Sequence, residues 1–264
     1  CVMHEDITQQ IIEEVPYQEL IPVDISEFTD DDVDAFLEVE REKKLTELPD
    51  PKVLPLISLE AYLLPENKKR IHIYVDMLVC DASSMFIILE ELHSFYNFPE
   101  GPLAPIGITF KDYLKYTNEH KEGKHFEASL KYWRARLETL PSGPSLALQK
   151  QPVEIEKPKF RRREFTLNKE AWSRFQEIAA SMNVTPTAVL LALYGKVLAT
   201  WSNSPHFCIN LTHFHRLQAH KDVNRIIGDF TSLIPLEVNI PATKTFDTYL
   251  KEVQSQLVND LEHD

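Results

Sequence analysis

The sequence predicts a mixed α/β (α+β) fold arranged as two lobes joined by a proline-rich linker. Each half of the chain holds strand-like segments, rich in β-branched and aromatic residues, beside segments with helical spacing of apolar residues. Between the halves, residues 140–158 carry spaced prolines, which keep a chain extended. This stretch is the best boundary between two lobes by composition, and the length of 264 residues also allows one large domain.

The elements of the first half are set by apolar spacing and by turn residues. In chain order, we expect short strands in residues 1–25 around Pro16, a helix from Thr29 to about residue 45, a hairpin of strands over 54–64 and 69–79, and helices over 82–96, 110–114 and 126–137. Thr29 is a good N-cap, and the three aspartates after it suit the positive end of the helix dipole.

The second half alternates strands with well-capped helices. In chain order, we expect a strand over 161–167, helices starting after Asn168 and Thr185, strands over 206–212 and just after residue 230, and a last helix over 246–261 capped by Thr245. Residues 187–201 are apolar nearly all round, which predicts a helix buried between a sheet and other helices.

Composition limits the class of protein and its partners. The 264 residues are 43% hydrophobic and 26% charged, as in an ordinary soluble globular protein. The formal charge of −13 argues against nucleic acid and anionic membranes as partners, although residues 157–163 form a local basic run. No apolar run reaches transmembrane length.

Cysteine and histidine spacing point away from disulfides and metals. Cys1, Cys80 and Cys208 form no spaced framework, so we expect free thiols in a reducing cytoplasm. The ten histidines show no ligand spacing with cysteines or acids, so we expect no metal site.

Two aspartates beside the turn after residue 75 need an explanation. Asp76 falls within the predicted apolar strand, where a carboxylate must find a partner or change its pKa because desolvating a charge is costly. Asp81 stands where a helix N-cap belongs. A structural role for both, with Asp76 paired to an arginine elsewhere in the chain, competes with a role in chemistry.

Four motifs in this order resemble those of the heterocyclization domains of nonribosomal peptide synthetases, a branch of the condensation-domain superfamily. The motifs are Asp76-x4-Asp81-x2-Ser84, the alternating prolines and leucines of residues 140–148, the run from Thr185-Pro186 to Trp201, and Gly228-Asp229-Phe230-Thr231 before a strand. In ordinary condensation domains two histidines stand in place of Asp76 and Met77, and the second is catalytic. Met77 has no useful proton to give or take, so a histidine does not act at this position.

The resemblance implies a fold like that of chloramphenicol acetyltransferase, with two similar lobes and a tunnel that admits two carrier-protein arms. It implies an N-terminal lobe over residues 1–148, a linker over 149–159 and a C-terminal lobe over 160–264. It implies two reactions. The amine of a carrier-bound Cys, Ser or Thr first attacks an upstream acyl or peptidyl thioester, and the side-chain thiol or hydroxyl then attacks the new amide carbonyl with loss of water, giving a thiazoline or oxazoline. The implied partners are upstream and downstream peptidyl or acyl carrier proteins and an adjacent adenylation domain, with no nucleic acid and no membrane. No cofactor is expected to be bound, because 4′-phosphopantetheine arms deliver the substrates.

The resemblance also suggests candidate site residues. Thr231 is the first choice for hydrogen bonding to the reacting carbon, and Asp260, on the helix after the Gly-Asp-Phe-Thr motif, is the candidate proton shuttle. Structural alternatives are a Thr231 that merely starts a strand and an Asp260 that is an exposed acid at a helix end. The motif aspartates complete the candidate catalytic set, which therefore also includes Asp76, Asp81 and Asp229; Asp76 and Asp229 are expected mainly to orient loops between the lobes. Candidate substrate-binding residues are Asn210, Thr212, Ser84 and Ser232.

The sequence departs from the family pattern in two respects. His215 stands where the family commonly has Asn before Arg216. The family's opening and final motifs are absent, so we expect a chain truncated at both ends, which could leave it inactive even if its parent is active. The alternatives are an ordinary condensation domain or stand-alone acyltransferase, against which Met77 argues, and a non-catalytic fragment that only docks carrier proteins.

Overall fold

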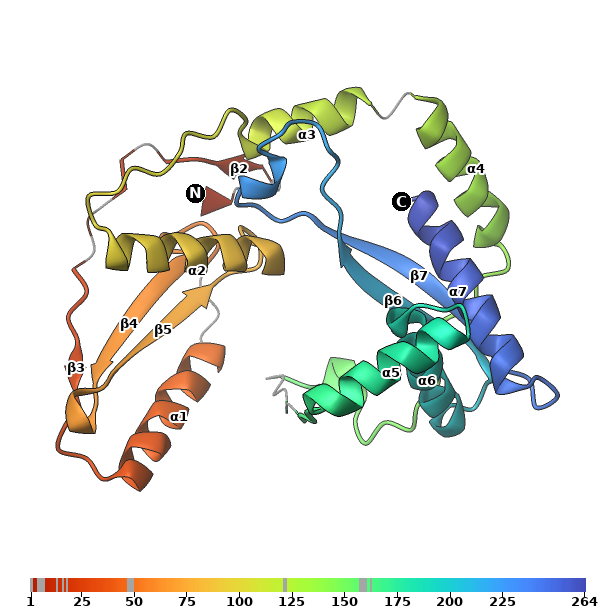
Figure 1. Ribbon diagram of the computed structural model, residues 1–264, viewed down its shortest axis with the longest axis horizontal. Coiled ribbons are helices and arrows are strands. Elements are labelled where there is room, and N and C mark those ends of the chain that lie inside the picture. Colours follow the sequence, from red (N-terminus) through yellow and green to blue (C-terminus); the bar gives the residue numbers. More distant parts are fainter. Residues whose placement is uncertain are drawn as a thin grey trace. The chain divides into compact units, whose positions relative to one another are not determined.

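The computed structural model describes residues 2–3, 8–12, 14–15, 17, 19–46, 50–120, 123–156, 161 and 163–264. Contacts divide the chain into two compact units (Figure 1). Unit 1 comprises residues 1–110 and 218–230, and unit 2 comprises residues 111–217 and 231–264. The units differ in extent from the expected lobes, because residues 111–148 group with unit 2 and residues 218–230 with unit 1. The expected lobes over 1–148 and 160–264 stay a prediction.

Unit 1 is built on a three-stranded sheet of order β3–β4–β5. Strand β3 (Val23–Asp24) pairs in parallel with β4 (Ile57–Leu63), and β4 pairs antiparallel with β5 (Lys69–Val75) in the predicted hairpin. The other elements are the short pair β1 (Val2–Met3) and β2 (Gln9–Gln10), the helices α1 (Asp30–Thr46) and α2 (Ala82–Asn97), and the 3-10 turns at Pro65–Asn67 and Val223–Arg225.

Each helix of unit 1 packs on its own small apolar cluster. Val33 and Leu37 of α1 join Tyr62 of β4 in one cluster, and Met85 and Ile88 of α2 pack on a second cluster around Leu56, Val79 and Cys80. Full burial of one such side chain stabilises a fold by roughly 1.5–3 kcal/mol. These clusters therefore fix α1 and α2 on the hairpin.

Unit 2 packs three helices on one face of a two-stranded sheet. Its elements are α3 (Phe110–Glu119), which begins at the unit boundary, α4 (Lys124–Leu137), a 3-10 turn (Pro152–Glu154), α5 (Lys169–Ser181), α6 (Pro186–Trp201), β6 (His206–Phe214), β7 (Thr231–Asn239) and α7 (Phe246–Glu262). Strands β6 and β7 are antiparallel. Residues from α5, α6 and α7 meet Phe207 of β6 and Val238 of β7 in one core.

The predicted helix caps are confirmed. Thr29 and Asn168 accept backbone N–H groups at 3.3 and 2.8 Å. Thr185 and Thr245 accept them at 3.2 and 3.3 Å. Such caps satisfy N–H groups that have no partner within the helix. Cys80 and Cys208 are free thiols, whereas Cys1, Pro16 and most of the basic run 157–163 lie outside the described residues.

Three expectations about elements are wrong. Residues 163–167 form no strand, and Phe165 is exposed. Helix α6 is buried only along Ala188, Ala192 and Gly195, while larger side chains such as Tyr194 are exposed. Strand β5 ends at Val75, so Asp76 lies after the strand. In the described residues no single helix is long and apolar enough to cross a membrane. Helices α5 and α6 reach that length and composition only together, and the pair is bent by 94°.

Candidate functional site

The Asp-Ser motif and the Gly-Asp-Phe motif form one hydrogen-bonded cluster in unit 1. Asp81 Oδ1 accepts the Ser84 N–H at 2.6 Å, as an N-cap of α2, and its Oδ2 accepts the Phe230 N–H at 3.4 Å. The Asp81 N–H donates to the Gly228 carbonyl at 3.0 Å. Ser84 Oγ donates to the same carbonyl at 2.9 Å and accepts the Gly228 N–H at 3.1 Å. Since Asp81 and Ser84 are fully buried, both hold the distant loop in place.

Gly228 is required by packing within this cluster. A Cβ at this position would lie 2.5 Å from a ring carbon of Phe110. The Phe110 ring also meets Phe230 edge-on, with 5.1 Å between centroids. Asp229, which lies between Gly228 and Phe230 in the sequence, is exposed. The motif therefore turns Phe230 inward and Asp229 outward.

Asp76 caps a turn. Its Oδ1 accepts the Leu78 N–H at 2.9 Å, and its carbonyl accepts the Val79 N–H at 3.1 Å. A short polar side chain that bonds the backbone two residues on is the usual device of an Asx turn. Asp76 is half-buried. The expectation of a carboxylate inside an apolar strand is wrong, because the Asp76 carboxylate lies in a turn and bonds the backbone. Met77, in the same turn, is 54% exposed.

Three of the candidate residues share one face of the β6–β7 sheet. Thr231 stands opposite Phe214, Thr212 opposite Leu233, and Asn210 opposite Pro235. Directly paired residues point to the same face, and the face alternates along a strand. Thr231, Thr212 and Asn210 are all exposed on this face, which we call the threonine face. Ser232 pairs with His213 and points to the opposite face.

Asp260 lies elsewhere in unit 2, and it is fully buried. Its Oδ1 accepts the Tyr132 hydroxyl at 2.6 Å and forms an ion pair with Arg136. Its Oδ2 accepts the Gln256 amide at 3.3 Å. The expected alternative of an exposed acid at a helix end is wrong, because these contacts enclose the carboxylate between α4 and α7.

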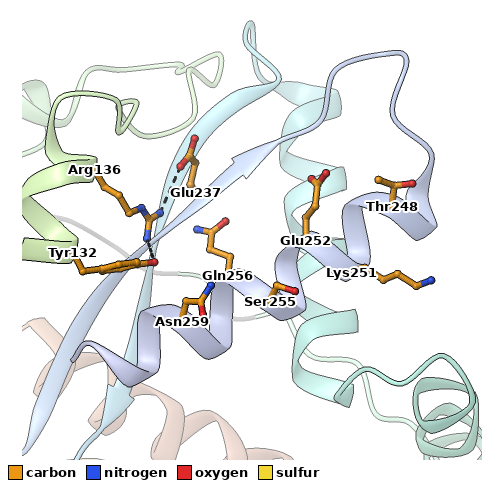
Figure 2. A pocket seen from close by; sticks show the side chains of 9 residues that line it. All are labelled: Tyr132, Arg136, Glu237, Thr248, Lys251, Glu252, Ser255, Gln256 and Asn259. Carbon is orange, nitrogen blue, oxygen red and sulfur yellow. Dashed lines mark hydrogen bonds and ion pairs between the residues drawn. The ribbon is translucent and has the colours of Figure 1, made fainter. Parts of the chain in front are cut away.

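Arg136 connects this carboxylate to the sheet, and Figure 2 shows its contact with Glu237 of β7. Its Nη2 lies 3.5 Å from Glu237 Oε2, and Glu237 Oε1 lies 2.7 Å from His206 Nε2. The guanidinium also lies over the rings of Tyr132 and Trp133, at 5.3 and 5.1 Å from their centroids. We call His206, Glu237, Arg136, Tyr132 and Asp260 the arginine network. It ties together β6, β7, α4 and α7.

Burial and charge perturb two groups of the arginine network. Burial and the hydrogen bond to Asp260 raise the pKa of Tyr132 to about 12. Burial lowers the pKa of the Arg136 guanidinium, but the charges and hydrogen bonds of Asp260 and Tyr132 together outweigh burial and raise it. Tyr132 thus stays a neutral donor and Arg136 a cation at neutral pH. Sequence reasoning missed Arg136. The only local signal for this residue was its place as a cation in the last turn of a helix that carries Tyr132 and Trp133.

A polar hollow of about 570 Å³ opens beside the arginine network. Figure 2 shows Arg136 between Tyr132 and Glu237, facing Gln256 and Asn259 along α7. Arg136, Glu237 and Glu252 in its lining each form an ion pair, and Lys251, Gln256, Asn259 and the hydroxyls of Thr248 and Ser255 complete its polar lining. Among the described residues no group of three or more His, Cys, Asp and Glu side chains could hold a metal ion.

His215, the residue that departs from the family pattern, contacts the end of the chain. Its Nδ1 lies 2.7 Å from Asp264 Oδ2, and His213 Nε2 lies 3.1 Å from the same oxygen. The position is therefore part of a contact between β6 and the residues after α7.

The condensation domain family model matches residues 2–264. The chain belongs to the condensation domain family. Bacitracin synthase 1 of Bacillus licheniformis is 34% identical over 263 residues, which cover 99% of this chain and 5% of that protein. Phenyloxazoline synthase MbtB of Mycobacterium tuberculosis is 30% identical over 204 residues, which cover 76% of this chain and 14% of that protein.

A solved structure matches this condensation domain closely. The EpoB cyclization-docking bidomain from a nonribosomal peptide synthetase of Sorangium cellulosum superposes with a TM-score of 0.89 at 30% identity. The match covers 99% of this chain and 53% of that one, so the chain spans about half of the solved bidomain. The predicted family and the mixed α/β condensation-type fold are confirmed by these matches.

Proposed function

We propose that this condensation domain is a heterocyclization domain of a nonribosomal peptide synthetase. It joins a carrier-bound acyl or peptidyl thioester to a carrier-bound Cys, Ser or Thr and then cyclises the product to a thiazoline or oxazoline. Its partners in this proposal are the two carrier proteins, whose 4′-phosphopantetheine arms bring the substrates, and an adjacent adenylation domain.

The observation that carries the proposal is Met77. In ordinary condensation domains a catalytic histidine stands at this position of the motif, but here a thioether projects from the turn that Asp76 caps. A thioether neither donates nor accepts a catalytic proton. Two relatives support the ring-forming branch by name, since one is a phenyloxazoline synthase and the other a cyclization bidomain.

The chemistry has two balanced steps. In the first, the acceptor amine adds to the thioester carbonyl, the C–S bond breaks, and the amine proton leaves with the carrier thiol. In the second, the side-chain sulfur or oxygen adds to the new amide carbonyl and closes the ring. The former carbonyl oxygen then leaves as water, taking the proton of the thiol or hydroxyl and the proton of the amide nitrogen, and a C=N bond forms within the ring. The second step needs groups that move protons on and off one tetrahedral carbon.

Thr231 is the proposed hydrogen-bonding group at that carbon. Its exposure on the threonine face leaves it reachable by a substrate, and Thr212 and Asn210 continue the polar row along the sheet. Asp260 stays the proposed proton shuttle. Because its oxygens are enclosed by Arg136, Tyr132 and Gln256, it would act as an acceptor through Tyr132 or after the ion pair opens. Asp81 and Ser84 contribute by holding the loop that precedes Thr231.

The test is intact-mass spectrometry of a loaded carrier pair. One carrier holds an acyl donor and the other holds cysteine, and both are mixed with the protein. We expect a condensed product lighter by one further water than the amide. Thr231→Ala should stop at the open amide, and Thr231→Ser should restore ring formation. Thr200→Ala is the matched control, since this threonine is exposed on α6 and its hydroxyl bonds only its own helix.

The other outcomes separate the alternatives. Amide without further loss of water would overturn the heterocyclization proposal in favour of plain condensation. Carrier binding without any condensation would favour a non-catalytic docking role. Ring formation that survives Thr231→Ala would leave the reaction in place and remove this threonine from it.

A further inference from the structure

The first part of the proline-rich segment 140–158 is hydrogen-bonded to strand β6 and to the residues just before this strand. The Cys208 N–H donates to the Ser142 carbonyl at 2.9 Å, and the Asn203 N–H donates to the Ser145 carbonyl at 3.1 Å. The Ser145 N–H donates to Ser202 Oγ at 3.1 Å, and Leu146 forms a β-bridge with Ser202. These contacts hold residues 142–146 beside the sheet.

Residues 140–146, α6 and the β6–β7 sheet line a pocket of about 610 Å³, which we call the linker pocket. This is within the usual range of small-molecule sites, roughly 300–1,000 Å³. Its apolar lining includes Leu140, Pro144 and Leu146 of the linker and Leu198 of α6. Asn210 of β6 supplies an amide to the same lining. A pocket that combines apolar side chains with polar groups suits an apolar group attached to a hydrogen-bonding chain.

The linker pocket and the threonine face share residues of the sheet. Asn210 lines the pocket and also lies on the threonine face with Thr212 and Thr231. Thr231 stands opposite Phe214, four residues along β6 from Asn210, which at about 3.4 Å per residue is ~14 Å. An extended peptide covers that distance with about four residues.

We propose that the linker pocket binds the distal apolar side chain of an extended peptidyl donor whose reacting carbonyl lies at Thr231. The inference rests on the proposed function and adds a substrate class to it: donors about four residues long that end in an apolar residue. The donor backbone would lie along the threonine face, with Asn210 bonding it at the mouth of the pocket. Short or polar-ended donors lose these contacts.

The test compares three donors loaded on the carrier. They are a single alanyl group, the peptidyl group Leu-Ala-Ala-Ala with leucine distal, and the same peptide with aspartate in place of leucine. Wild-type protein should turn over the leucine donor about tenfold faster than the aspartate donor at low concentration, the scale of discrimination expected for one apolar pocket contact. Equal rates for the leucine and aspartate donors would overturn the proposal.

Gly143→Leu fills the linker pocket without straining the backbone. A Cβ at Gly143 would meet only the Cys208 carbonyl at 4.0 Å, and no glycine in the described residues has a positive φ. We expect the leucine-to-aspartate ratio to fall to near one. Leu148→Ala is the matched control, because this exposed linker leucine does not line the pocket, and it should keep the wild-type ratio. A ratio that is unchanged in Gly143→Leu would contradict the proposal.

A second readout does not depend on turnover. Cys208 lines the linker pocket, whereas Cys80 is fully buried. Alkylation of Cys208 by N-ethylmaleimide, located by peptide mapping, should slow several-fold with the free amide of Leu-Ala-Ala-Ala and stay unchanged with the aspartate peptide. Protection by neither peptide, or by both equally, would overturn the pocket assignment even where rings form. Protection by the leucine peptide alone would uphold the pocket even if no donor is turned over, so the two proposals fail separately.

Discussion

Gly195→Ala should destabilise the protein although it improves helix propensity. Gly195 lies in the middle of α6, where alanine is favoured by about 1 kcal/mol. Its added Cβ, however, would lie 2.5 Å from Tyr249 Oη and 3.2 and 3.4 Å from the two methyl groups of Val238. Tyr249 and Val238 are both buried in the core of unit 2, so neither can swing away. Overpacking of this kind costs about 1–3 kcal/mol, so after the gain in helix propensity we expect a net loss of up to about 2 kcal/mol.

The Tyr249 hydroxyl makes this prediction testable by a double-mutant cycle. Tyr249 Oη is buried and has no hydrogen-bond partner among the described residues. Tyr249→Phe removes the atom nearest the new Cβ and an unpaired polar group, so alone it should be neutral or stabilising by up to about 1 kcal/mol. In urea unfolding, the double variant should be more stable than the sum of the single changes by about 1 kcal/mol or more. Strict additivity, or a Gly195→Ala variant more stable than wild type, would refute the argument.

Three further predictions concern buried charges and pH. Arg136→Ala leaves the buried Asp260 without its cation and should cost about 3–5 kcal/mol in urea unfolding, so a loss below about 1 kcal/mol would contradict the described network. Asp81→Ala removes a buried cap that also holds the Phe230 N–H and should cost about 1–3 kcal/mol, measured in the same way. Burial raises the pKa of Glu60, but hydrogen bonds led by that of Tyr62 outweigh it and hold the pKa below its usual value. Its stabilisation is therefore present at neutral pH and is lost as the pH falls through the lowered pKa, so Glu60→Gln should flatten the acid limb of a stability profile.

Local signals in the sequence were sufficient for the elements that depend on local physics. Asp81, Asn168 and Thr185 cap helices where expected, because a cap is a contact within three residues. The hairpin over β4 and β5 follows from two strand-like runs and the turn between them. The position of Asp76 was missed because an apolar run does not reveal where a strand ends. Here the strand ends in a turn in which the Asp76 side chain bonds the backbone two residues on.

The arginine network was beyond reach of the sequence for a different reason. Arg136 and Asp260 are brought together by the packing of α4 on α7, which no local pattern encodes. Asp260 was singled out by resemblance, but its burial and its three partners were not foreseen. The family motifs put Asp81 and Asp229 in one candidate set, but the hydrogen bonds that join Ser84 to Gly228 were not foreseen.

The contact between the linker and β6 also bears on how the chain avoids aggregation and tolerates insertion. A strand with open N–H and carbonyl groups along one side is a template on which a second chain can add. The backbone of Ser142 occupies that side of β6 at Cys208, so the linker shields an edge. Lengthening the chain between residues 140 and 146 would displace Ser142 from Cys208 and expose the edge of the strand. Length changes between residues 147 and 151, which precede the 3-10 turn at Pro152, would leave these contacts in place, so this is where an insertion should be tolerated.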